Sequence, residues 1–358
     1  MLQIAIDFPD SLIDIDRKIT ISGAAAHQLV TVQTMTERGG GQVWRSQLVY
    51  KSDAQGKVDL STAVPEGMET ALPLQLLYEQ RPENAATQDV YPLSVHHALH
   101  TQIDVSSEGQ QAQTVLTQRL ATETVQRVEL DQDGVKGVFF VPTFAGDKPA
   151  VLVLKSAAEQ PVQEELAALY AARGYMALAL DYAHTPAAEA SKEDLALFEC
   201  ALRWLRESCK PKHQFVAVCG TGQGAQLALL LGVRFSLEVS AVIAWEPATS
   251  QFEAQLIAVD QLQGPLLMAS GKAHHGSAYF KQVVAQLEQS GFDYRVQWYN
   301  FEGVAAGLQP PHVPVRLHCD VASQVVDLAT ANKTLWFGVI AFLHQAVAEA
   351  ATPNQLHA

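Results

Sequence analysis

The fold of this chain is indicated first by the stretch Val216-Ala-Val-Cys-Gly-Thr-Gly-Gln-Gly-Ala-Gln-Leu-Ala-Leu-Leu230. An apolar run of buried-strand length passes through three closely spaced glycines into a run with helical character. Two known patterns fit such a turn. A nucleophile elbow, Gly-x-Ser-x-Gly, spans Gly220 to Gly224 and places Gly222 where the serine should stand. A dinucleotide fingerprint, Gly-x-Gly-x-x-Gly/Ala, uses Gly220, Gly222 and Ala225.

The order of apolar runs along the chain favours the elbow. A dinucleotide fold places its fingerprint after the first strand, whereas here three apolar runs precede the turn and three follow it. Those runs are 138–141, 150–154, 175–180, 239–244, 265–269 and 294–298. Helical patterns fill the gaps between runs, at 161–173, 193–207, 225–235, 278–290 and 335–349. This alternation predicts a mostly parallel sheet covered by helices on both faces.

The first third of the chain has a different texture. Short alternating runs predict strands at 19–22, 29–33, 43–50 and 100–105, with turns at 38–41 and 52–56. They indicate a small antiparallel, immunoglobulin-like β-sandwich. The stretch from Ser106 to Gln113 shows neither period and is expected to be a linker. We therefore expect a β-sandwich domain over 1–118, an α/β domain over 119–351 and a tail over 352–358.

Composition narrows the possible partners. The chain has 358 residues, 48% hydrophobic and 17% charged, and a net charge of −14. An acidic surface repels phosphate backbones, so neither nucleic acid nor an anionic membrane is expected as a partner. The N-terminus shows no secretion signal and no apolar run reaches membrane-spanning length, which predicts a cytoplasmic protein. Four cysteines without a C-x-x-C pair give no reason to expect a metal or another cofactor.

Several motifs, in order across both regions, carry a resemblance to a known family. They include Leu72-Pro-Leu-Gln-Leu-Leu-Tyr78, Gly137-Val-Phe-Phe-Val-Pro142, Ala177-Leu-Ala-Leu-Asp-Tyr182 and Pro310-Pro311. In these the chain resembles the acyl-CoA thioesterases and bile acid-CoA:amino acid N-acyltransferases. The resemblance implies a sandwich followed by an α/β-hydrolase domain, and a Ser or Cys nucleophile at the elbow. The neighbours Gln223-Gly-Ala-Gln226 fix the register, and the matching residue is Gly222.

The other catalytic positions implied by the resemblance are also changed. The family's acid follows the strand that ends near Gly271, where this chain has Ala273 and His274. The family's histidine lies shortly before the paired prolines, where this chain has Ala305 and Ala306. The triad is therefore expected to be lost.

Four residues are candidates for substitute catalytic roles. Cys219 and Thr221 are nucleophilic but point away from the elbow apex, and a packing role is the commoner one. Glu246 could supply the acid, although an exposed carboxylate at a strand end is more usual. His312 could swing inward as a base, although a loop histidine without a catalytic role is more usual. His274 and His275 lack a third ligand, so no metal site is expected.

The main functional hypothesis is a catalytically inactive or severely impaired family member. It would bind an acyl-CoA or other acyl thioester, or a protein partner, in the old cleft. The candidate ligand-binding residues are Lys155, Ser156, Thr221 and Gln223. An active thioester hydrolase or acyltransferase with a relocated nucleophile is one alternative. A dinucleotide-binding protein is the other.

Overall fold

The computed structural model describes residues 1–84, 94–157, 162–183, 192–250 and 257–352. The chain forms two compact units. The first comprises Met1–Thr122 and Gln309–Lys333, and the second comprises Glu123–Leu308 and Thr334–Ala358. The first boundary lies four residues beyond the predicted one at 118, but the α/β domain expected over 119–351 is interrupted, because 309–333 pack with the first unit.

The first unit is built from two β-sheets. A six-stranded sheet has the order β2-β9-β8-β4-β5-β7 and a three-stranded sheet has the order β1-β3-β6. All neighbours are antiparallel except β2 and β9. The strands are β1 (Gln3–Ile6), β2 (Asp10–Leu12), β3 (Ile19–Ser22), β4 (Leu29–Arg38), β5 (Gln42–Lys51), β6 (Val58–Asp59), β7 (Arg81–Pro82), β8 (Leu99–Ser107) and β9 (Gln110–Arg119). A short helix, α1 (Gln75–Tyr78), precedes β7.

The predicted linker at Ser106–Gln113 is wrong. This stretch is the tip of a hairpin in which β8 pairs with β9 over its full length, from Leu99 opposite Gln118 to Ser107 opposite Gln110. Glu108 and Gly109 form the turn, with φ of +45° and +77°. Two consecutive residues with positive φ are typical of the tight turns that match the twist of a hairpin.

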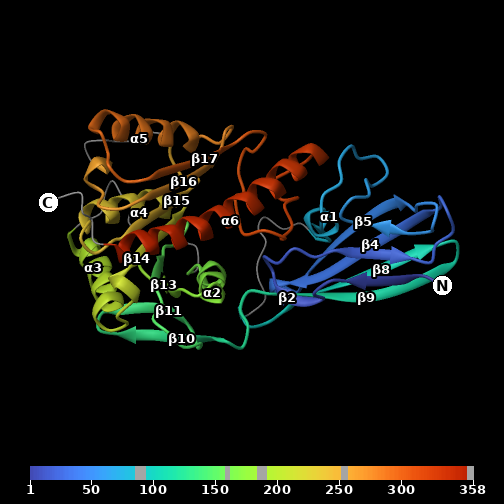
Figure 1. Cartoon of the computed structure of the whole chain (residues 1–358), viewed down its shortest axis with the longest axis horizontal. Helices are drawn as coiled ribbons and strands as arrows, with labels where there is room; N and C mark the ends of the chain where they lie inside the picture. The colour runs from blue at the N-terminus through green and yellow to red at the C-terminus, as the bar shows by residue number, and fades with distance from the viewer. Residues whose placement is uncertain (85–93, 158–161, 184–191, 251–256, 353–358) are drawn as a thin grey trace. The chain divides into compact units, whose positions relative to one another are not determined.

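The second unit contains an eight-stranded sheet of order β10-β11-β13-β12-β14-β15-β16-β17 (Figure 1). The pairs β10–β11 and β11–β13 are antiparallel, and all others are parallel. The strands are β10 (Val125–Gln132), β11 (Val135–Pro142), β12 (Ala150–Val153), β13 (Met176–Leu180), β14 (Val216–Thr221), β15 (Ala241–Trp245), β16 (Leu266–Gly271) and β17 (Val296–Phe301). The expected fold class, a β-rich region followed by an α/β-hydrolase domain, is confirmed.

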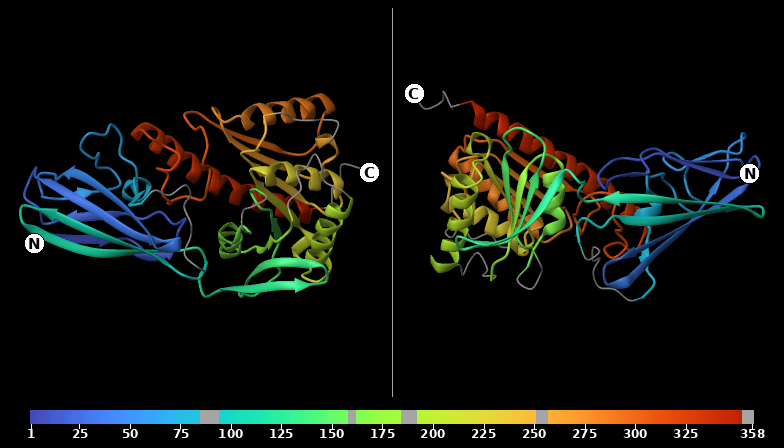
Figure 2. Two further views of the ribbon diagram at one scale, coloured as in Figure 1. Left: turned by 180° about the vertical axis from the view of Figure 1, so that it is seen from behind. Right: turned by 90° about the horizontal axis from the view of Figure 1, so that it is seen from below.

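Helices cover both faces of this sheet (Figure 2). They are α2 (Glu164–Ala172), α3 (Lys192–Glu207), α4 (Gln223–Arg234), α5 (Gly276–Ser290) and α6 (Ala322–Ala351). Side chains of α3, α4 and α5 share one buried cluster with one face of the strands, including Leu205, Leu229 and Phe280. On the other face α2 meets α6 through the rings of Tyr170 and Trp336, whose centroids lie 5.4 Å apart.

Helix α6 is longer than the predicted 335–349. By length and composition alone it could cross a membrane, which the expectation of no membrane-spanning run overlooked. One face of its second half is nevertheless fully buried, at Leu335, Trp336, Val339, Phe342 and Leu343. The core helix of a soluble protein meets the same length and composition criteria, and packing accounts for this buried face.

Candidate functional site

The elbow lies where β14 passes into α4, at the carboxyl edge of the parallel strands. Gly222 caps α4 with φ +59° and ψ −125°, a conformation that L-residues adopt only under strain. A Cβ on Gly220 would collide with the carbonyl oxygen of Gly224, and a Cβ on Gly224 would collide with that of Lys155. The two outer glycines are therefore required by close packing, and the strand-turn-helix geometry of a nucleophile elbow is retained.

The loop after β12 lies directly against the elbow apex. The backbone N–H of Gln223 donates to the carbonyl oxygen of Ser156 at 2.8 Å. A Cβ on Gly222 would stand 2.5 Å from this same oxygen. In an elbow enzyme, the N–H that follows the nucleophile stabilises the oxyanion. Here the carbonyl oxygen of Ser156 already accepts that N–H, and it also occupies the space that the Cβ of a nucleophile would need.

The positions expected for the acid and the base hold no such pair. Ala305 and Ala306 are exposed in the turn after β17 and cannot titrate. Ala273 is exposed after β16, and the Nδ1 of its neighbour His274 accepts the backbone N–H of Gly276 at 3.0 Å. Burial, and then the adjacent His275, lower the pKa of His274. Nδ1 is thus occupied within its own turn.

Glu246 is not the exposed strand-end carboxylate that is usual at such a position. It directly follows β15, adopts a φ of +44° and is half-buried. Its Oε2 accepts the backbone N–H groups of Gly307 at 3.3 Å and Leu308 at 3.2 Å. Burial raises the pKa of Glu246 to about 7, against the opposing effect of the two N–H donors. Among the described residues, its buried Oε1 has no partner.

The two candidate nucleophiles differ in their surroundings. Cys219 is fully buried in β14, and its Sγ lies 3.2 Å from the hydroxyl of Tyr170. Burial raises the pKa of its thiol to about 12, so the reactive thiolate is suppressed. Thr221 ends β14 opposite Trp245 and is partly exposed. Neither residue lies at the apex.

His312 is a loop histidine, as expected, but it is buried. Only 2% of it is exposed, and it belongs to the first compact unit rather than to the elbow's unit. Its Nδ1 lies 2.7 Å from the carbonyl oxygen of Ile13 and its Nε2 lies 3.3 Å from a carboxylate oxygen of Asp16. The contact with His312 holds the pKa of Asp16 well below its usual range. His312 pins 309–333 to the N-terminal strands, and both of its ring nitrogens are engaged there.

The candidate ligand-binding residues all lie near the elbow, but they differ in whether their polar side-chain atoms are already paired. Lys155 is buried, and its ammonium pairs with Asp181 at 2.6 Å and donates to the carbonyl oxygen of Tyr182 at 3.1 Å. The Oγ of Ser156 accepts from Gln163 at 3.2 Å. Gln223 buries its Oε1 without a partner among the described residues.

Sequence reasoning missed Asp181 and Tyr182, which neutralise and fix Lys155. Their position immediately after the predicted strand 175–180 was the available signal. Three segments that follow β12, β13 and β15 lie outside the described residues: 158–161, 184–191 and 251–256.

The dinucleotide alternative finds little support in this geometry. A pyrophosphate is bound by free N–H groups at the start of a helix. The first N–H of α4 already donates to Ser156. For a metal, no cluster of three or more His, Cys, Asp or Glu side chains occurs within the described ranges.

Comparisons with known proteins agree with this architecture. Residues 14–132 match the family model described as the acyl-CoA thioester hydrolase/BAAT N-terminal region. Residues 135–345 match the dienelactone hydrolase family. Together the two models span almost all of both compact units.

Curated relatives match over various lengths. Human bile acid-CoA:amino acid N-acyltransferase is 23% identical over 96% of this chain and 98% of its own length. Mouse acyl-coenzyme A amino acid N-acyltransferase 2 is 25% identical over 70% of this chain, a match that spans 62% of the mouse protein. Mouse peroxisomal succinyl-coenzyme A thioesterase is 21% identical over 83% of each chain. The chain thus belongs to the dienelactone hydrolase family, whose model covers more than half of it, and its first part matches the acyl-CoA thioester hydrolase/BAAT N-terminal region.

Proposed function

We propose that this chain is a non-catalytic member of the acyl-CoA thioesterase/BAAT family that binds an acyl thioester at the elbow. One observation carries the proposal: Gly222 stands at the apex, with the Ser156 carbonyl oxygen 2.5 Å from the point where a side chain would begin. A site built this way has neither a nucleophile nor room for one.

The chemical losses are large enough to remove turnover. Loss of a serine nucleophile costs about a millionfold in kcat in a serine protease, and loss of one oxyanion donor costs about a hundredfold or more. These costs do not add when the groups work as a unit, but the first alone removes most of the rate enhancement. The described turns at Gly222, at 272–276 and at 302–308 offer no nucleophile-histidine-acid set to replace it.

Binding is supported by unpaired polar atoms at the same edge. Gln223 and Glu246 each bury a side-chain oxygen that has no partner among the described residues. A buried acceptor left without a donor costs about 1–3 kcal/mol. The pantetheine arm of an acyl-CoA carries amide N–H groups that would satisfy such acceptors. The relatives' names also refer to coenzyme A thioesters.

The test combines binding with turnover. Purified protein is titrated calorimetrically with a panel of acyl-CoA thioesters, and thiol release is followed on the same panel. The expected result is saturable heat without thiol release above the buffer rate, and weaker binding by the Gln223→Ala variant. Lys281→Ala, on the exposed surface of α5, is the control variant.

Two outcomes would contradict the proposal. Thiol release at enzyme-like rates, abolished in Thr221→Ala, would establish the relocated nucleophile instead. Absence of heat with every thioester would remove the ligand and leave a protein partner as the occupant of the cleft.

A further inference from the structure

A cavity lies at the edge of the parallel sheet opposite the elbow. Its volume is about 340 Å³, within the range of small-molecule sites. It is lined by Pro149 and Tyr175, which directly precede β12 and β13, and by Lys212 and His213, which precede β14. Because these strands are parallel, their amino ends share one edge and the elbow occupies the other. The cavity is therefore separate from the family's cleft.

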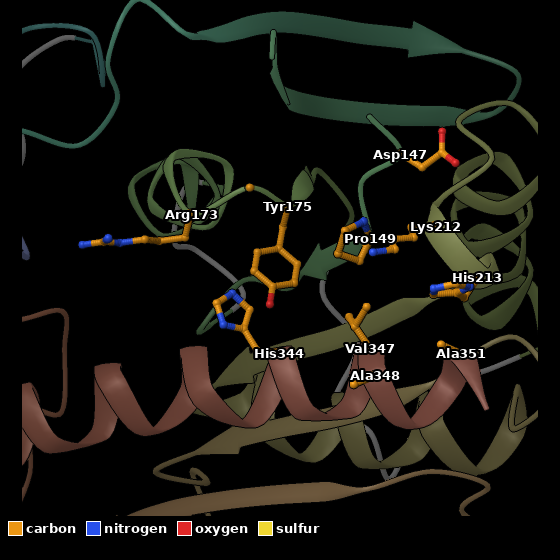
Figure 3. A pocket seen from close by; sticks show the side chains of 11 residues that line it. Asp147, Pro149, Arg173, Tyr175, Lys212, His213, His344, Val347, Ala348 and Ala351 are labelled. Atoms are coloured by element: carbon orange, nitrogen blue, oxygen red, sulfur yellow. The ribbon is translucent and has the colours of Figure 1, made fainter. Parts of the chain in front are cut away.

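One side of the cavity is aromatic and apolar (Figure 3). The rings of Tyr175 and His344 stack at a centroid distance of 6.0 Å and an interplanar angle of 16°. Tyr175 is buried, whereas His344 on α6 is exposed and accessible to a further ring. Val347 and Ala348 follow on the same helix and extend the apolar wall. Planar rings pack well on such a surface.

The other side is cationic. Lys212 and His213 are exposed there, and Asp147 is the one acid among the described lining residues. Some cations of this unit are paired, such as Lys155 with Asp181. Lys212 takes part in no ion pair within the described part of the chain. Lys281 on α5 is likewise exposed and in no ion pair among the described residues, but Lys212 and His213 line a cavity.

The turn that presents these cations is strained but firmly held. Lys210, His213 and Gln214 have φ of +48°, +56° and +56°, each costing roughly 1–3 kcal/mol for a residue other than glycine. The backbone N–H of Lys212 donates to the carbonyl oxygen of Lys148 at 2.9 Å, which ties the turn to the strand that it adjoins. Strain of this kind persists only where the surroundings fix it, and it gathers at ligand clamps.

We propose that this cavity binds a small planar aromatic anion. The ligand's ring packs on His344 and the Val347–Ala348 wall, and its anionic group pairs with Lys212 and His213. A ring alone lacks the ion pair and an inorganic anion alone lacks the stacking surface, so both parts are needed. The proposal is independent of what occupies the elbow cleft.

The probes are benzoate and adenosine 5′-monophosphate, which carry a ring with a carboxylate or a phosphate. Each is titrated into the full-length protein up to about 10 mM by calorimetry, with saturation-transfer NMR on the ring protons. We expect saturable binding of at least one probe, and the better probe identifies the anionic group. Lys212→Glu should abolish binding, and His344→Ala should weaken it about tenfold.

Lys281→Glu is the matched control, because it makes the same charge change at an exposed lysine on α5 of the same unit. It should bind as the wild-type protein does. Lys212 and His344 are both exposed, so their variants are expected to fold, and thermal unfolding of each variant checks this. Equal affinity for inorganic phosphate and adenosine 5′-monophosphate would overturn the proposal, as would unchanged binding by Lys212→Glu or no binding of either probe.

Discussion

Replacing Gly222 by serine would place a hydroxyl at the elbow apex, where a Gly-x-Ser-x-Gly elbow carries its nucleophile. The structure predicts that this variant gains no activity and loses stability. The new Cβ would begin 2.5 Å from the carbonyl oxygen of Ser156, closer than real Cβ contacts come. The loop after β12 must therefore move, and the hydrogen bond from Gln223 to Ser156 is weakened or lost.

The size of the loss follows from two contributions. A residue other than glycine at φ +59° and ψ −125° costs roughly 1–3 kcal/mol. Losing one hydrogen bond adds about 0.5–1.5 kcal/mol. We expect a loss of about 1.5–4.5 kcal/mol, which lowers the melting temperature of a unit of this size by roughly 3–18 °C.

Calorimetric melting and thiol release from acyl-CoA thioesters measure the two effects. Gly291→Ser is the matched control, because Gly291 has a φ of +68° in the same unit and a Cβ there would meet nothing within 4 Å. It should lose only the roughly 1–2 kcal/mol of a left-handed conformation. A Gly222→Ser variant as stable as the control, or one that releases thiol well above the buffer rate, would refute the reasoning.

Three further predictions concern other residues. Cys219→Ala should leave thiol release and thioester binding unchanged, because the thiol is buried against Tyr170. A loss of either signal would make Cys219 a candidate nucleophile again. Glu246 has a pKa of about 7 in the folded protein, above its ordinary 4.5. Between these two pH values the folded protein keeps a proton that the unfolded chain releases. The free energy of unfolding therefore falls as the pH rises through this range. Glu246→Gln should flatten that fall and gain up to about 3 kcal/mol at pH 8 in urea titrations, and an unchanged pH profile would contradict this. His312→Ala should leave the Ile13 carbonyl oxygen unpaired and cost the first unit about 1–3 kcal/mol, while thioester binding stays intact; a drop in binding with no change in melting would point to a role in the site.

The sequence predicted the central strands well because they are buried on both faces. The run 175–180, for example, becomes β13, in which all five residues from Met176 to Leu180 are buried. The hairpin strand β9 escaped prediction because its first half is mostly exposed and rich in glutamine. Only pairing with β8 shows that this segment is a strand, and such pairing is a tertiary effect.

The same limit applies to the site. Gly222 at the elbow apex was read directly from local spacing. The carbonyl oxygen that covers Gly222 belongs to Ser156, which lies 66 residues earlier in the chain. No local sequence pattern predicts this contact. The sequence predicts an exposed Glu246 because a carboxylate at the end of a strand is usually exposed. The N–H groups that hold it belong to Gly307 and Leu308, on a turn that follows a different strand.

The division of the chain between its two compact units limits which fragments can be expressed separately. A fragment that ends at Thr122 would lack Gln309–Lys333, and with it the partner of Glu79, Arg316. A fragment that begins at Glu123 would keep 309–333 but leave Val315 and Leu328, both buried in the intact chain, without their covering residues. Either half, expressed alone after a single division of the chain, should therefore be poorly soluble. Co-expression of both halves, or a circular permutation that keeps 309–333 with the first unit, is the more promising way to study them apart.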